Sequence, residues 1–248
     1  MQAGHLFWKA HQVGNNESGR GDERISHSNY RKDYNKGKIM VKKLVIGIDE
    51  VGRGCIAGPV TVAVALMPKD FKAPITLPEL RDSKKMTRTQ REAWYKWIIS
   101  EGECAGVFVS VSSVTPKTVD RINITKSANL AAWRSLNKMA NRCKNIAPGT
   151  NVVLDGGLFL KNRRFQEKGN FPFKARTIIG ADGKFKEVQI ASVVAKVLRD
   201  NYMRRMAKKY PNFGFESHKG YGTNFHFVAL RHNGAIKGFH RRTFIKGK

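Results

Sequence analysis

The most informative stretch of the chain is residues 44–54, Leu-Val-Ile-Gly-Ile-Asp-Glu-Val-Gly-Arg-Gly. Its first five residues are aliphatic or small, which predicts a buried strand that carries Asp49 and Glu50 to its C-terminal end. Adjacent carboxylates repel each other and lose hydration on burial, so the pair is costly unless a divalent cation or a proton is shared between them. That cost indicates chemistry at this strand end.

The composition points to a partner made of phosphates. The chain has 248 residues, of which 41% are hydrophobic and 10% aromatic, enough for a globular core. Its 46 lysines and arginines outnumber 19 acidic residues, for a net charge of +27. Such an excess is typical of nucleic-acid binding, with a merely solvated basic surface as the alternative.

Cysteine usage and hydropathy exclude several classes of protein. Cys55, Cys104 and Cys143 are far apart and follow no metal-ligand spacing, so neither a zinc site nor a disulfide framework is expected. No apolar stretch is long enough to cross a bilayer, and the N-terminus lacks the apolar region of a secretory signal. We expect a cytoplasmic protein with no membrane partner.

The pattern along the chain predicts an α/β fold with one catalytic domain. Residues 1–39 are polar and charged without a sustained period, which predicts a flexible basic extension before a domain over 40–248. The domain should hold a central mixed sheet flanked by helices, with its first two strands forming a hairpin and residues 159–173 a loop or hairpin. Strands are expected at 44–48, 59–66, 106–111, 151–155 and 176–179, helices at 88–100, 124–143 and 187–210, and one more helix with a tail in the last 35 residues.

Acids follow three of these strands. Asp49-Glu50, Asp155 and Asp182 come from different strand ends, and side chains at one edge of a sheet converge. Four carboxylates without His or Cys suit Mg²⁺ or Mn²⁺. In nucleases two such ions ~3.5–4 Å apart activate a water and stabilise the leaving oxygen. Taken singly, each acid could instead be a turn or cap residue, as in the dipeptide Asp182-Gly183.

Several motifs, in order along residues 44–244, resemble the type 2 ribonucleases H, the ribonuclease HII family. They are Asp49-Glu50-Val51-Gly52-Arg53-Gly54 with Ala57-Gly58-Pro59-Val60, Asp82-Ser83-Lys84-Lys85-Met86-Thr87, Leu154-Asp155-Gly156, Asp182, Ala191-Ser192, Ala195-Lys196-Val197, Arg199-Asp200, His218-Lys219-Gly220-Tyr221-Gly222-Thr223 and His240-Arg241-Arg242-Thr243-Phe244.

The resemblance implies a ribonuclease H-like fold with a C-terminal helical extension. It also implies an endoribonuclease that hydrolyses the RNA strand of RNA/DNA hybrids and cuts 5′ of ribonucleotides embedded in duplex DNA. The products would carry a 3′-hydroxyl and a 5′-phosphate, and the cofactor would be Mg²⁺ or Mn²⁺. By the family's pattern, the metal-binding and catalytic quartet is Asp49, Glu50, Asp155 and Asp182.

The same resemblance assigns the substrate contacts. Gly52, Arg53 and Gly54 would sense the ribose 2′-hydroxyl, Tyr221 would stack on the following deoxyribose, and Lys84 would steady a phosphate. Glycines allow a backbone to approach a sugar closely, and locally only the 2′-hydroxyl distinguishes RNA from DNA. A tyrosine between two glycines should be exposed and flexibly placed, which suits stacking.

Two departures from the family's pattern bear on the site. Gly180 stands where a lysine is usual, so a supporting cation for Asp182 would be absent or supplied by Lys184 or Lys186. Residues 188–192 are bulkier than the family's small-residue run, which could shift the packing of the following helix.

Two alternatives remain open at this point. A type 3 ribonuclease H would need a further N-terminal substrate-binding domain, which residues 1–39 are too few to form. A binding protein without turnover is disfavoured, because four acids without metal would repel phosphate. We expect a monomer; residues 244–248 are too generic to predict a replication-clamp contact.

Overall fold

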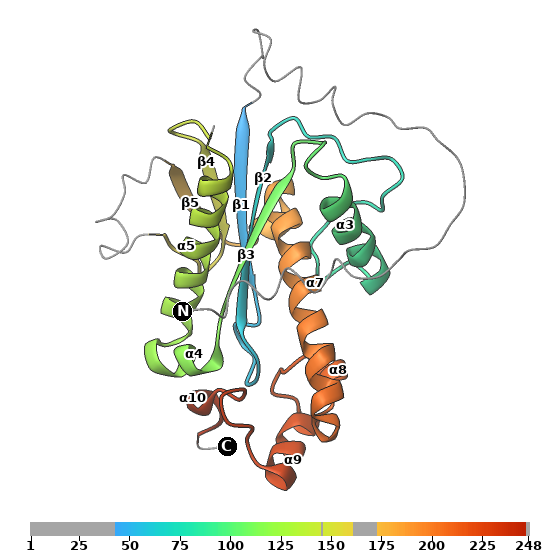
Figure 1. Cartoon of the computed structure of the whole chain (residues 1–248), viewed down its shortest axis with the longest axis vertical. Helices are drawn as coiled ribbons and strands as arrows, with labels where there is room; N and C mark the ends of the chain where they lie inside the picture. The colour runs from blue at the N-terminus through green and yellow to red at the C-terminus, as the bar shows by residue number, and fades with distance from the viewer. Residues whose placement is uncertain (1–42, 145, 161–172, 247–248) are drawn as a thin grey trace. The chain divides into compact units, whose positions relative to one another are not determined.

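The computed structural model describes residues 43–144, 146–160 and 173–246, and the predictions for 1–39 and most of 159–173 lie outside them. The strands are β1 (Leu44–Val51), β2 (Val60–Pro68), β3 (Phe108–Val114), β4 (Asn151–Asp155) and β5 (Lys174–Ile178) (Figure 1). The helices are α3 (Arg88–Ser100), α4 (Pro116–Ile122), α5 (Ile124–Arg142), α7 (Lys186–Lys209), α8 (Phe215–His218), α9 (Asn224–Asn233) and α10 (Arg242–Ile245), with short 3₁₀ turns η1 (Ala181–Gly183) and η2 (Pro211–Phe213).

The five strands form one mixed sheet in the order β3-β2-β1-β4-β5. β1 pairs antiparallel with β2, from Leu44 opposite Pro68 to Val51 opposite Thr61, so the predicted hairpin is confirmed. β2 and β3 are antiparallel, whereas β1 with β4 and β4 with β5 are parallel. Because β1 and β4 run in the same direction, their carboxyl ends meet at one edge of the sheet.

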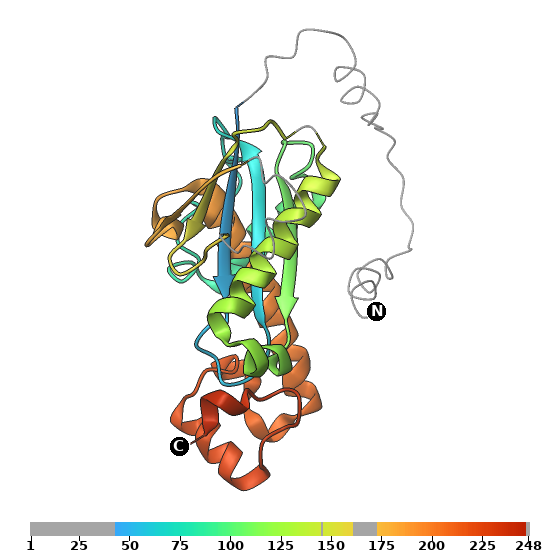
Figure 2. The same ribbon diagram turned by 90° about the vertical axis from the view of Figure 1, so that its left-hand side faces the viewer.

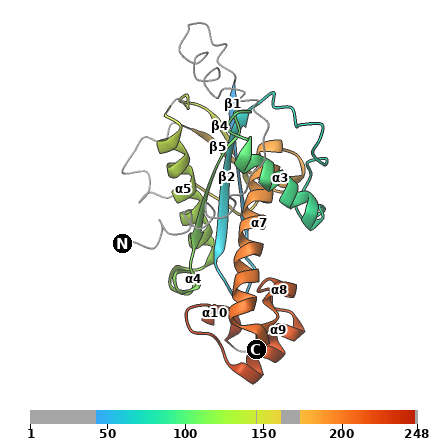
Figure 3. The ribbon, with the colours of Figure 1, turned by 45° about the vertical axis from the view of Figure 1, so that its right-hand side comes forward.

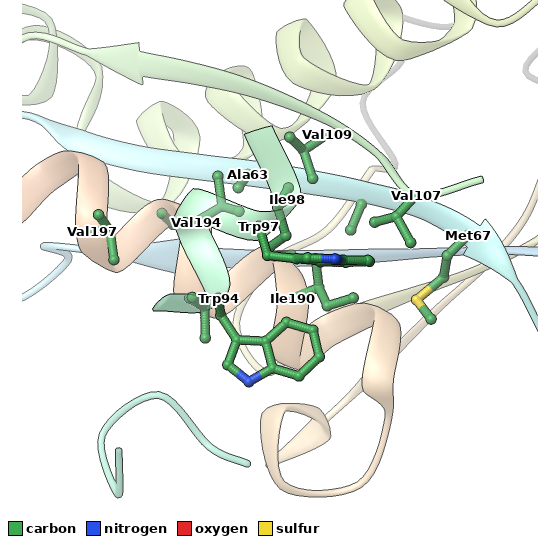
Figure 4. Close-up of a cluster of buried hydrophobic side chains, with 14 of the residues drawn as sticks. Ala63, Met67, Trp94, Trp97, Ile98, Val107, Val109, Ile190, Val194 and Val197 are labelled. Atoms are coloured by element: carbon green, nitrogen blue, oxygen red, sulfur yellow. The ribbon is translucent and has the colours of Figure 1, made fainter. Parts of the chain in front are cut away.

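Helices cover both faces of the sheet, as Figures 2 and 3 show, with α5 on one face and α7 and α3 on the other. The α3 side is filled by Trp94 and Trp97, whose rings meet edge to face at 5.8 Å (Figure 4). Trp94 also donates its indole N–H to the carbonyl of Pro78 at 2.8 Å. The prediction that both tryptophans are core residues is confirmed.

Helix α7 runs directly against the backbone of β1. A Cβ added to Gly47 would lie 2.2 Å from the carbonyl carbon of Glu187 and 2.4 Å from the amide nitrogen of Val188, so only glycine fits here. From Glu187 to Ser192 the helix rises about 7.5 Å, and from Gly47 to Asp49 the strand rises about 6.6 Å. This contact therefore sets Ser192 beside Asp49.

The structure differs from the sequence expectations mainly at short elements. The last 35 residues form three short helices instead of one, because residues with positive φ interrupt them: Lys219 and Gly220 between α8 and α9, and Gly234 and Gly238 between α9 and α10. Helix α4 was not predicted, since seven residues are too few to show a helical period. Within the described residues, none of the helices has the length and apolar character needed to span a bilayer.

Replacing Gly47 by alanine tests the contact between β1 and α7. We expect the free energy of unfolding to fall by about 1–3 kcal/mol, because backbone must move to admit the methyl group. Gly54→Ala is the matched control, since a Cβ there meets nothing within 4 Å, and its change should stay within about 0.5 kcal/mol. Urea denaturation followed by circular dichroism measures both, and equal stability of the two variants would contradict the contact.

Candidate active site

Asp49 and Glu50 lie inside β1, not after it. They pair with Ala63 and Val62 of β2, and β1 continues to Val51, so the prediction that the strand stops at residue 48 was wrong. Alternation along the strand sends the two side chains to opposite faces. Asp49 is buried at 4% exposure, and the side chain of Glu50 is 10% exposed.

The ionised form of both carboxyl groups is destabilised by its surroundings. Burial, and then repulsion by Glu50 and Asp155, raises the pKa of Asp49 well above its usual value. Burial also raises the pKa of Glu50 to about 7, although the Arg53 guanidinium opposes the shift. The Ser192 hydroxyl opposes the pKa shift of Asp49, and it lies 2.7 Å from the hydroxyl of Ser83. The amide N–H of Glu50 donates to Oδ1 of Asp49 at 2.7 Å.

The remaining two acids come from neighbouring elements. Asp155 ends β4 and lies close enough to repel both Asp49 and Glu50. Its Oδ1 accepts the amide N–H of Ala181 at 2.7 Å, which ties η1 to the end of β4. Asp182 lies in η1 and is 5% exposed.

The cation beside Asp182 is Lys84. Its ammonium donates to Oδ2 of Asp182 at 3.0 Å while the lysine side chain stays 74% exposed. Lys186 instead donates to the carbonyl of Phe71 at 3.4 Å. The sequence left open whether the cation beside Asp182 is absent or supplied by Lys184 or Lys186. The structure gives neither outcome, because Lys84, in the loop before α3, supplies the cation.

The acids fit a hard divalent cation in their chemistry. Among the described residues, Oε2 of Glu50 is a buried carboxylate oxygen that accepts no hydrogen bond. An unsatisfied anionic oxygen beside two further carboxylates is costly unless a cation completes the site. No three His, Cys, Asp or Glu side chains in the described ranges are arranged to hold a metal as they stand. Two cations contact the acids: Lys84 contacts Asp182, and Arg53 contacts Glu50.

The loop after β1 is shaped by its own glycines. Gly52 has φ +84°, and a Cβ there would meet Nε of Arg199 at 2.1 Å, so no other residue fits. Gly54 differs, because a Cβ at this position has open space within 4 Å. The folded protein therefore requires glycine at 52 but does not itself require it at 54.

The Arg53 side chain turns back onto the acids. Its guanidinium contacts Oε1 of Glu50 at 3.3 Å and donates to the carbonyl of Gly157 at 2.9 Å and to Oγ1 of Thr125 at 3.2 Å. In the structure it links the loop to Glu50 and to the turn after β4.

Tyr221 is exposed as predicted, at 41%, but it is not flexibly placed. Its N–H donates to the carbonyl of His218 at 2.9 Å, and it bridges the backbone of Cys55. Its carbonyl lies 2.9 Å from Nδ1 of His226, which must donate because a carbonyl only accepts. The tyrosine backbone is thus anchored on both sides.

Two neutral histidines, His226 and His240, form a hydrogen-bonded relay that ends on the Tyr221 carbonyl. The N–H of Ile236 donates to Nδ1 of His240 at 2.8 Å, so His240 carries its proton on Nε2 and donates it to Nε2 of His226 at 3.1 Å. Both rings are buried, and burial lowers the pKa of each to about 4. The His218 ring stacks on His226 at 4.2 Å.

Sequence reasoning gave no role to several of these residues. Ser192, Arg199, His240 and Arg241 appear in the motifs, but their partners lie far away in sequence, and no spacing rule connects them. Their residue types were the one available signal, because polar and charged side chains that become buried need hydrogen-bond partners.

Comparison with known proteins agrees with this architecture. The family model described as Ribonuclease HII matches residues 46–247. A Ribonuclease HII of Fusobacterium nucleatum subsp. nucleatum is 39% identical over 204 residues, 82% of this chain and 86% of the relative. A Ribonuclease HII of Thermosynechococcus vestitus is 36% identical over 202 residues, 82% of this chain and 84% of the relative.

Solved structures share the fold. The PCNA:RNase HII complex of Archaeoglobus fulgidus contains a chain that superposes with a TM-score of 0.57 at 23% identity, covering 80% of this chain and 94% of that one. Bst-RNase HIII in complex with Mn²⁺ gives a TM-score of 0.61 at 18% identity, covering 82% and 68%. The mixed sheet flanked by helices is thus a ribonuclease H-like fold, as expected.

Fold and acids together define the class: a metal-dependent ribonuclease, a hydrolase acting on nucleic acid. The chain belongs to the ribonuclease HII family. The family match favours the type 2 over the type 3 alternative, and the activity of the family is that of a ribonuclease H endonuclease.

The histidine relay predicts a pH dependence of stability. His226 and His240 titrate near pH 4 when folded, against 6.5 when unfolded, so only the unfolded chain takes up protons between these values. Their contribution is complete above pH 6.5 and is lost as the pH falls toward 4. In urea unfolding, His226→Gln should flatten this part of the wild-type profile. Exposed His232→Gln is the control, and an unchanged slope in His226→Gln would contradict the relay.

Proposed function

We propose that this ribonuclease cuts on the 5′ side of ribonucleotides embedded in duplex DNA, as well as hydrolysing RNA paired with DNA. The products carry a 3′-hydroxyl and a 5′-phosphate. One observation supports the proposal most directly: Arg53 links the loop to the acids. Arg53 belongs to the Gly52–Gly54 loop, and its guanidinium contacts Glu50. A loop that senses the sugar is thereby fixed to the groups that serve the cut.

In this proposal Asp49, Glu50, Asp155 and Asp182 hold Mg²⁺ or Mn²⁺. Two ions bound there would activate the attacking water and stabilise the leaving oxygen. The chain's own contribution is to pre-position the oxygens. The Glu50 amide orients Asp49, and the Ala181 amide orients Asp155, so both carboxylates are fixed before substrate arrives.

Lys84 has two tasks in this account. In the described structure its ammonium neutralises Asp182, and its exposed stem leaves room for a second contact. We assign it a phosphate of the cleaved strand as that contact, since an ammonium is a mobile point charge. The positive net charge of the chain supports general attraction to the duplex.

Recognition of the ribonucleotide falls to the loop and to Tyr221. Open space over Gly54 allows the backbone to approach the 2′-hydroxyl, the group that distinguishes RNA from DNA. Tyr221, exposed and anchored through its backbone, offers a rigid face for stacking on the next deoxyribose. We further propose that residues 40–248 form the catalytic domain and that the chain acts as a monomer.

The cleavage assay tests the proposal as a whole. With Mg²⁺ or Mn²⁺, the protein should cut a duplex with one ribonucleotide on its 5′ side and leave the matched all-DNA duplex intact. Asp49→Asn should abolish cleavage while the dissociation constant for the duplex stays nearly unchanged, because the isosteric amide weakens metal binding only. Cleavage of both duplexes, or turnover by Asp49→Asn, would refute the assignment.

Gly54→Ala separates substrate approach from folding. The methyl group meets no protein atom within 4 Å, so stability should be retained. If the backbone at 54 contacts the sugar, the methyl group should lower kcat/KM at a single ribonucleotide by about tenfold or more, the cost of about 1.4 kcal/mol of displaced contact. Steady-state kinetics measure this, and wild-type kcat/KM in the variant would exclude close approach at residue 54.

A further inference from the structure

Two buried arginines support the loop from Gly52 to Pro59 through its main-chain carbonyls. Arg241 is fully buried and Arg199 is 1% exposed. Among the ion pairs formed by described residues, neither arginine takes part. Asp120 acts on Arg241 as a nearby charge but forms no ion pair with it. Burying a guanidinium outside an ion pair is costly, so the hydrogen bonds that these arginines make have to offset a large penalty.

Arg241 donates its guanidinium N–H groups to main-chain carbonyls of the loop. Nη2 donates to the carbonyl of Gly52 at 2.7 Å, and Nη1 donates to that of Arg53 at 2.9 Å. Nη2 and Nε also reach the carbonyl of Gly58, at 2.9 and 3.1 Å. One side chain from the C-terminal segment therefore fixes two consecutive peptides immediately after β1.

Arg199 of α7 does the same for a different part of the loop. Its guanidinium donates to the carbonyls of Ala57 and Pro59, each at 3.1 Å, and to that of Lys219 at 2.8 Å. It touches Gly52 only by packing beneath its Cα. The orientation of the peptides after Gly52 and Arg53 thus depends on Arg241.

The direction of each carbonyl fixes the direction of the N–H in the same peptide. In a trans peptide the C=O and the following N–H point in opposite directions, and the described chain has no cis bond. Because the carbonyls of Gly52 and Arg53 point at Arg241, the amides of Arg53 and Gly54 point away from it. Neither amide donates to any group in the described structure. Two adjacent donors are therefore left for a ligand.

We propose that Arg241 is a positioning residue for sugar recognition: it holds the two peptides so that the amides of Arg53 and Gly54 are presented to the ribose 2′-hydroxyl. The inference rests on the proposed role of the loop and adds the group that enforces it. A lysine could not replace it, because one ammonium cannot span three carbonyls as the flat guanidinium fork does.

Binding without metal, so that no cleavage occurs, tests this assignment. The readout is the ratio of dissociation constants for an all-DNA duplex and the same duplex with one ribonucleotide, measured by fluorescence anisotropy. Arg241→Lys should lower this ratio at least about fivefold, the equivalent of one neutral hydrogen bond of about 1 kcal/mol. Affinity for the all-DNA duplex should be unchanged, because the phosphate contacts do not involve Arg241.

Arg199→Lys is the matched control, since it also removes a buried guanidinium but leaves the carbonyls of Gly52 and Arg53 engaged. It should keep the ratio. A wild-type ratio near one would refute the proposed role of the loop. If the wild type prefers the ribonucleotide duplex and Arg241→Lys keeps the same ratio of dissociation constants, the assignment to Arg241 is wrong. It is also wrong if the ratio falls equally in Arg241→Lys and Arg199→Lys.

A wild-type measurement keeps the inference testable if Arg241→Lys fails to fold. By NMR, the amides of Arg53 and Gly54 should exchange rapidly with water in the free protein. They should become protected in the metal-free complex with the ribonucleotide duplex and remain exchanging with the all-DNA duplex. Protection in the free protein, or equal protection by both duplexes, would overturn the proposal.

Discussion

Two neighbouring carboxylates held in the central strand of the sheet are the constraint on which the rest of the structure depends. Asp49 and Glu50 are held in place because both pair with β2, β1 pairs with β4 up to Ile48, and α7 lies directly on Gly47. Their burial leaves an oxygen of Glu50 unsatisfied and raises the pKa of both groups. The surrounding donors, Ser192, Arg53 and, beside Asp182, Lys84, offset only part of that cost.

The acids Asp49 and Glu50 and the loop Gly52–Gly54 are linked into one unit by hydrogen bonds. Arg53 connects the loop to Glu50, and Arg241 and Arg199 hold the loop carbonyls from below. Tyr221 joins the same unit through Cys55 and the histidine relay. In the proposed function, sugar recognition and cleavage would therefore share a rigid support of buried polar side chains at the end of β1, where the C-terminal helices gather (Figure 1).

The sequence predicted the long elements and indicated the acids at the strand ends as a candidate site, because both carry local signals. Apolar runs marked β1, β2 and β4, and the period of α7 was apparent from Ile190 to Met203. The partners of buried polar groups could not be predicted, since they depend on contacts distant in sequence. Lys84 reaches Asp182 across 98 positions, and Arg241 reaches Gly52 across 189. The short C-terminal helices escaped prediction because glycine conformations, not periodicity, define them.

Direct measurement of metal binding tests the central claim, that the buried acids are completed by a cation. Isothermal titration calorimetry with Mn²⁺ should be carried out on the wild-type protein and on Glu50→Gln. The substitution replaces the carboxylate, including its unsatisfied oxygen, by a neutral amide of the same shape. The account predicts saturable binding to the wild type and an affinity at least about tenfold weaker for Glu50→Gln, given that even indirect partners of a metal contribute this much. Equal affinity of the two proteins, or no binding by the wild type, would contradict it.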